Sequence, residues 1–98
     1  SPAVSQGSGL STGSAYQNPF GYDVVLTVYL AVTAATSGTI QVGVGPTNTP
    51  TQQTVVSALT LASLAIIPLT IYLPASYYAL VTLTTVTATI SGQQAMPV

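Results

Sequence analysis

Apolar and polar residues alternate along most of the chain with the two-residue period that is typical of β-strands. The clearest run is Val24 to Thr33, in which every second residue from Val24 to Val32 is Val or Leu. The same period returns in Thr39 to Val44, and Ser37-Gly38 between the two runs has turn composition. The pattern therefore predicts a β-hairpin whose first strand buries its Val and Leu face.

Further strands are predicted on both sides of this hairpin, because Thr, Val, Ile and Tyr dominate the rest of the chain and suit a pleated sheet. A loop with two prolines, residues 45–50, separates the hairpin from the later strands. The further predicted strands are Ser14 to Gln17, Gln52 to Leu59, Ala65 to Leu73, Tyr77 to Thr84, Val86 to Ile90 and a short one near Gln94 to Met96. Ala58 to Ala65 is the one segment whose composition would also suit a helix. The fold class predicted is all-β, a single β-sandwich or jelly roll of about seven or eight mostly antiparallel strands.

The first residues have a different composition from the rest. Ser1 to Gly13 is rich in Ser and Gly and has no sustained period. We expect a flexible or extended N-terminal arm over residues 1–13 and a β-sandwich domain over residues 14–98.

One segment is long enough to raise the alternative of a membrane-spanning helix. Ala58 to Ala75 has eighteen residues without a charge. Pro68 and Pro74 interrupt it, no Lys or Arg flanks it, and Ile66 to Leu73 alternates with the period of a strand. The sequence therefore favours a strand here and argues against a membrane partner.

Ionisable side chains are almost absent from the composition. The 98 residues include no Lys, Arg, His or Cys, and Asp23 is the only acidic one. General acid–base and nucleophilic catalysis need a base or a paired acid, metal sites need several ligands, and nucleic-acid binding needs Lys or Arg. We therefore expect a protein that is not an enzyme, holds no metal or other cofactor and binds no nucleic acid. Asp23 itself is expected to cap the turn after Gly21-Tyr22.

The low charge also bears on self-association. The net charge is −1, only 1% of residues are charged, and the mean hydropathy is +0.62. A soluble domain usually has about a quarter of its residues charged, so copies of this chain have little electrostatic repulsion to keep them apart. We expect a homo-oligomer or a subunit of a lattice, with much of its surface covered by neighbouring subunits.

Aromatic side chains are the candidates for these subunit contacts, since they are enriched in protein interfaces. The candidate contact residues are Phe20, Tyr22, Tyr72, Tyr77 and Tyr78. Because Tyr77 and Tyr78 are neighbours in a predicted strand, one is expected to be buried and the other to be available for contact. A sugar-stacking platform of these rings, or a hydroxyl array of the many threonines, is the alternative interpretation.

Three short motifs carry a resemblance. They are the run Gly13-Ser-Ala-Tyr-Gln-Asn-Pro-Phe-Gly-Tyr-Asp-Val, the run Tyr72-Leu-Pro-Ala-Ser-Tyr-Tyr, and Thr89 to Gly92. With the strands between them they resemble small β-sandwich structural proteins of bacteriophage-like virions. The resemblance implies a component of the virion surface, most of all a capsid decoration (cement) protein, often a trimer, that contacts its own copies and a major capsid protein. It supplies no catalytic residues.

Two other functions stay open at this level. One is a secreted, extracellular filament subunit assembled by β-strand addition, in which an N-terminal segment completes a neighbour's sheet. Ser1 to Gly13 offers only Ala3, Val4 and Leu10 as apolar residues, which argues modestly against it. The other is a tail-appendage or carbohydrate-binding head domain.

Overall fold

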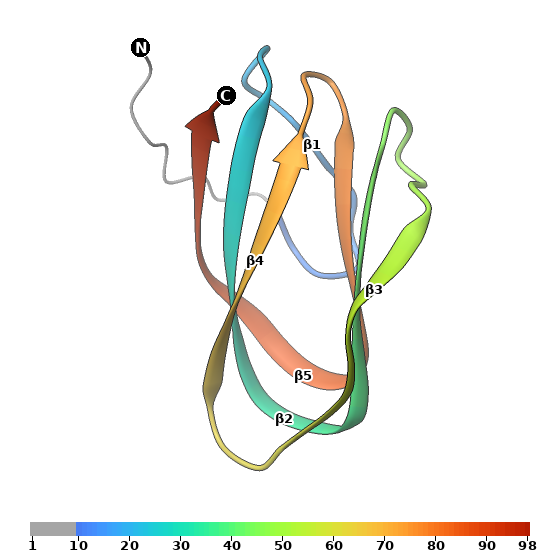
Figure 1. The fold of residues 1–98 in the computed structure, drawn as a ribbon, viewed down its shortest axis with the longest axis vertical. Coiled ribbons are helices and arrows are strands. Elements are labelled where there is room, and N and C mark those ends of the chain that lie inside the picture. The colour runs from blue at the N-terminus through green and yellow to red at the C-terminus, as the bar shows by residue number, and fades with distance from the viewer. Residues whose placement is uncertain (1–9) are drawn as a thin grey trace.

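The computed structural model describes residues 10–98, and these form five β-strands in a single antiparallel sheet (Figure 1). The strands are β1 (Tyr16–Gln17), β2 (Val24–Gly45), β3 (Gln52–Leu61), β4 (Ala65–Leu73) and β5 (Tyr78–Pro97). The all-β prediction is confirmed. The described residues include no helix, and hence none with the length and apolar character to cross a membrane.

Strand β2 lies at the centre of the sheet. Along one edge it pairs with β5 over nearly its whole length. Along its other edge, residues 24–32 pair with β4 and residues 35–43 pair with β3. Strand β1 adds to the first residues of β5. Because β3 and β4 occupy successive stretches of the same edge of β2, each keeps one edge that no strand of the described chain covers.

The predicted hairpin at Ser37-Gly38 is wrong, because β2 runs on through it as one strand. β2 and β5 bend together at this point, and Ser37 and Thr85 adopt positive φ angles of 45° and 53°. The ladder shifts register between Ala35 and Thr39, and the Thr85 hydroxyl donates a hydrogen bond to the Thr36 carbonyl (2.9 Å). A bulge with a bend therefore replaces a turn.

The number of strands follows from these bends. The segments predicted as separate strands at Tyr77 to Thr84, Val86 to Ile90 and Gln94 to Met96 are one strand, β5. Residues 10–98 thus form five strands rather than seven or eight. Figure 1 shows β2 and β5 folding back at the bend, so that the two halves of the sheet face each other.

The core lies between these halves. The predicted apolar face of β2 is buried, since its members are at most 1% exposed: Val24, Leu26, Val28, Leu30 and Val32. Across from them Ile40 and Val81 supply the second half of the sheet, and Leu73 of β4 completes the cluster. Burial of each such side chain contributes about 1.5–3 kcal/mol, which is what holds the bent sheet closed.

Part of the predicted N-terminal arm can be placed. Leu10 is buried in the core, and the Gly13 N–H donates a hydrogen bond to the Val81 carbonyl (2.7 Å). Residues 10–13 thus belong to the folded domain. The rest of the predicted arm, residues 1–9, lies outside the described residues.

Candidate functional site

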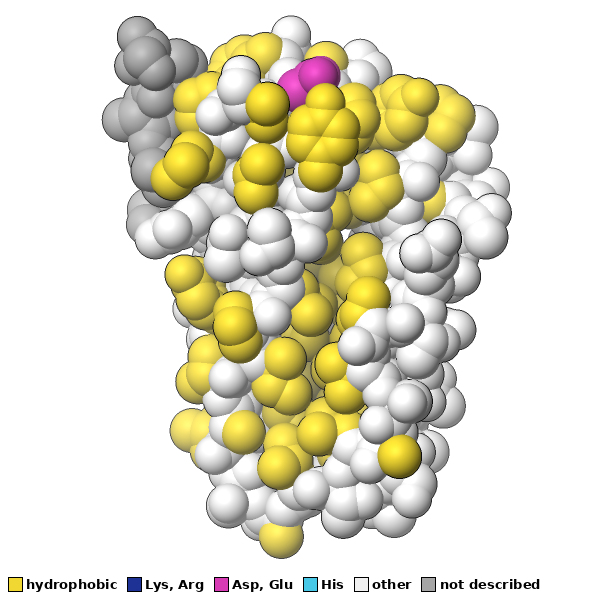
Figure 2. All heavy atoms as spheres, in the orientation of Figure 1, with side chains coloured by type: hydrophobic (Ala, Val, Ile, Leu, Met, Phe, Trp, Pro, Cys, Tyr) yellow, Lys and Arg dark blue, Asp and Glu magenta, His cyan; other side chains and the backbone are white. Residues whose placement is uncertain are grey.

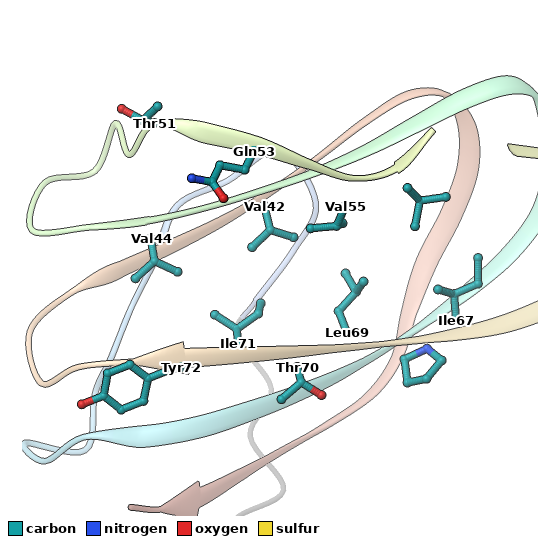
Figure 3. Close-up of a pocket in the computed structure, with 12 residues that line it drawn as sticks. Val42, Val44, Thr51, Gln53, Val55, Ile67, Leu69, Thr70, Ile71 and Tyr72 are labelled. Carbon is teal, nitrogen blue, oxygen red and sulfur yellow. The ribbon is translucent and has the colours of Figure 1, made fainter. Parts of the chain in front are cut away.

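An open apolar cleft of about 550 Å³ lies between β3 and β4. Figure 2 shows it as a long hollow with hydrophobic side chains along its floor and sides, and Figure 3 shows side chains of β2, β3 and β4 around it. Its apolar lining consists of Val42, Val44, Val55, Val56, Ile67, Pro68, Leu69, Ile71 and Tyr72. Ligand and partner sites commonly take this form, an apolar concavity with a few polar groups at its rim.

The cleft is open because β3 does not fill it. Gln53 lies opposite Val42 in the β2–β3 ladder, and Thr51 also lines the cleft, so polar side chains stand along the β3 wall. As a result Val44 stays 37% exposed and Val55 51% exposed. The chain leaves apolar surface in water here, which costs free energy until something covers it.

The β4 wall is better formed. Its side chains alternate between the two faces of the sheet, with Leu69, Ile71 and Leu73 buried and Ile66 and Tyr72 about half exposed. This is the alternation predicted for the segment from Ile66 to Leu73. β4 therefore borders the cleft with side chains of both faces, and Ile66 and Tyr72 are the large apolar side chains that it leaves partly in solvent.

A hydrogen-bond cluster at one end of β4 contains the only charged side chain. The Tyr72 hydroxyl donates to one oxygen of the Asp23 carboxylate (2.7 Å), and the Ala75 N–H donates to the other (2.9 Å). The Ala75 and Tyr72 bonds lower the pKa of Asp23 below its ordinary value of 3.8, and the Asp23 bond raises the pKa of Tyr72. Asp23 thus fastens the end of β4 to the start of β2, and the expectation that it caps its own turn is wrong.

The five predicted contact residues differ in their exposure and in their relation to the cleft. Among them only Tyr72 lines the cleft. Phe20 and Tyr22 have ring centroids 5.9 Å apart, and Phe20 packs partly against the core. Neither Tyr77 nor Tyr78 is buried: Tyr77 precedes β5 and is 36% exposed, and Tyr78 is half-buried.

Sequence reasoning missed Asn18, which is buried and organises the same end of the molecule. Its side-chain nitrogen donates to the carbonyls of Tyr22 (2.9 Å) and Leu73 (3.0 Å), and its side-chain oxygen accepts from the Phe20 N–H (2.8 Å). The Asn18-Pro19 dipeptide signalled a turn, but nothing local signalled the contact with Leu73. Val44 and Val55 were also missed, because an aliphatic side chain does not stand out in so apolar a sequence.

A second buried polar group lies away from the cleft. Gln93 is 2% exposed, and neither its side-chain oxygen nor its nitrogen has a hydrogen-bond partner among the described residues. Burial raises the pKa of Tyr16, and the nearby Gln93 amide offsets part of that rise, although the pair lacks the geometry of a hydrogen bond. We assign Gln93 no functional role.

No protein-family model, curated protein or solved structure matches this chain. The cleft is therefore the feature of the molecule that bears most directly on function. Its lining is apolar with a few hydroxyl and amide groups, and the Asp23 carboxylate near its end already accepts two hydrogen bonds. Such a surface has no charge and combines apolar side chains with polar groups, so it suits an uncharged partner that can also form hydrogen bonds.

Proposed function

We propose that this chain is a non-enzymatic structural subunit of a larger assembly, in which it contacts copies of itself. The observation that carries the proposal is the apolar cleft between β3 and β4, open to solvent on a molecule with a single charged side chain. Covering Val44 and Val55 at the cleft and Ile66 beside it gains hydrophobic free energy. Asp23 and the chain termini are the only charged groups that could repel a second copy.

The assembly that we favour is a virus particle, with the chain as a decoration protein on the capsid surface. The support is the resemblance of the motifs around Tyr16 and Tyr72 to small virion proteins, in which the bent sheet would serve as the β-sandwich. In this proposal the partners are further copies, as a trimer or another oligomer, and a major capsid protein. The free edges of β3 and β4 also favour a second candidate, an extracellular filament subunit that assembles by strand addition.

A charge placed in the cleft tests self-association directly. Val55→Asp adds a carboxylate at the β3 wall, and Met96→Asp adds the same charge at a side chain of equal exposure (51% and 52%) that does not line the cleft. We expect the unmodified protein and Met96→Asp to sediment as oligomers, whereas Val55→Asp sediments as a monomer. Equal sedimentation of the two variants would show that the cleft is not the contact.

Electron microscopy of the native assembly separates the two candidates. A decoration protein appears as density on the outside of an icosahedral shell, and a filament subunit repeats along one axis. A chain that stays monomeric at millimolar concentration and is found in neither setting would contradict the proposal.

A further inference from the structure

We propose that two copies of this chain pair through the free edge of β4, antiparallel and about a two-fold axis at Leu69, so that their two clefts merge into one interior. The inference rests on the self-association proposed above and specifies the strand, its register and the side chains that meet.

The backbone of β4 offers a free edge with a known direction. Within the described chain β4 pairs with β2 alone. The Ser91 hydroxyl donates to the Tyr29 carbonyl (3.2 Å), so the polar backbone groups of Tyr29 face β5 and not β4. Tyr29 lies opposite Pro68, and the polar backbone groups of Pro68 therefore face the free edge. By the alternation of a strand, those of Ile66, Thr70 and Tyr72 do the same.

The sequence of β4 is suited to pairing with itself. β4 has nine residues with Leu69 at its centre. Ile66 and Tyr72 lie three residues on either side of Leu69, and they are 51% and 52% exposed. In an antiparallel pair centred on Leu69, Ile66 of one copy lies directly opposite Tyr72 of the other. Such apolar and aromatic cross-strand pairs stabilise a sheet.

The same pairing closes the cleft. A strand beside the free edge of β4 lies over the space between β4 and β3, where Val44 and Val55 are exposed. A two-fold axis perpendicular to the sheet keeps the inner faces of both β4 strands on the same side. The β4 strand of the second copy then reduces the exposure of these valines to solvent.

Few features protect this edge from pairing. In natural proteins, lysines or other charged residues on an edge strand often prevent it from pairing with another chain, and β4 has no charged residue. Pro68 is the residue of β4 that hinders pairing, because its nitrogen cannot donate a hydrogen bond across the edge. In the proposed register Pro68 lies opposite Thr70 of the second copy, so each copy lacks one N–H donor. The pairing is therefore weakened without being blocked.

Disulfide trapping tests the register, because the chain has no natural cysteine. We would mix Ile66→Cys protein with Tyr72→Cys protein under mild oxidation. Hydrogen-bonded strand pairs have Cα atoms about 5.5 Å apart, within the range that a disulfide spans. We expect a disulfide-linked dimer in the mixture and much less in either variant alone.

The control mixture replaces Tyr72→Cys by Thr84→Cys, an exposed position on β5. Equal yields of linked dimer from the two mixtures would overturn the proposed register. Self-association of the unmodified protein without register-specific trapping would refute the β4 pairing alone, whereas a strictly monomeric unmodified protein would refute the proposed function as well.

Substitution of Pro68 gives a second test that does not depend on cysteine. Pro68→Thr restores an N–H donor in each copy, and we expect the dimer to bind about tenfold more tightly in sedimentation. Thr70→Pro removes a donor from the same edge, and we expect binding about tenfold weaker. Both nitrogens face the free edge, so the ladder with β2 is kept. Unchanged dissociation constants in both variants would overturn edge pairing.

Discussion

Asp23 shows what one charged residue does in a molecule without others. Its carboxylate accepts hydrogen bonds from Tyr72 and from the Ala75 N–H, residues far along the chain. These bonds connect the start of β2 to the end of β4, beside the cleft. Both ends of the contact lie near solvent, so its strength depends on hydrogen bonds more than on Coulomb attraction.

The contact predicts how stability depends on pH. The pKa of Asp23 is lowered in the folded state, so its contribution is complete above the ordinary value of 3.8 and is lost as the pH falls through the lowered pKa. The pKa of Tyr72 is raised, so its contribution is complete below 10.0 and is lost as the pH rises through the raised pKa. We expect urea unfolding to give a constant free energy from about pH 5 to pH 9, because the sequence has no His or Cys, the side chains that ordinarily titrate in this range.

Two variants separate the parts of this contact. Asp23→Asn removes the acidic loss of stability, because a carboxamide does not titrate. Tyr72→Phe removes the Tyr72 part of the alkaline loss and leaves that of Tyr16, whose pKa is also raised by burial. It keeps the acidic loss, since the Ala75 N–H still binds the carboxylate. A steep loss of stability between pH 5 and pH 8 in either protein would contradict this account.

The bends of β2 and β5 decide the architecture at the level of the strands. They lie side by side, Gly38 against Val86, and the Thr85 hydroxyl fixes them to each other. Gly38 has no room for a side chain, because a Cβ there would lie 2.3 Å from a methyl carbon of Val86 and 3.1 Å from the Thr85 carbonyl oxygen. A side chain at this position would force Val86 or the bend itself to shift.

A methyl group at the bend is therefore expected to destabilise the fold. We expect Gly38→Ala to lower the free energy of unfolding by about 1–3 kcal/mol, as overpacked core positions do. Gly92→Ala is the matched control on β5, since its nearest neighbour to an added Cβ is a Tyr29 ring carbon at 3.9 Å. Urea denaturation of both variants makes the comparison, and an equal loss in both would show that the bend is not tightly packed.

The strand positions were predictable from the sequence to the extent that they depend on local alternation. Ala65 to Leu73 has the bounds predicted, and the buried face from Val24 to Val32 is the predicted one. The bend was not predictable, because Ser37-Gly38 has the composition of a turn and only its pairing with β3 and β5 keeps it within a strand. The cleft was not predictable either, since it depends on where β3 and β4 attach along β2.

On the scale of the whole molecule, the near absence of charge governs how copies meet. Salt screens Coulomb interactions, and here Asp23 and the termini are all that it can act on. Association is expected to depend on apolar contact and backbone hydrogen bonds.

This expectation can be measured by sedimentation over a range of sodium chloride concentrations. We expect the dissociation constant of the self-association to change by no more than about twofold between roughly 0.05 and 0.5 M, because there is almost no charge to screen. A tenfold change would show that ionic contacts with the termini or Asp23 control assembly.

The central position of β2 in the sheet also affects how the chain folds during its synthesis. A ribosome builds β2 before β3, β4 and β5, so its apolar face and both of its edges first emerge with no partner. The last of these partners, β5, is complete only at Pro97, long after β2 ends at Gly45. Such long-range pairing folds slowly and leaves unpaired strands open to aggregation. The nascent chain is therefore expected to complete this sheet only after β5 has been synthesised, and to benefit from a chaperone that shields β2 until then.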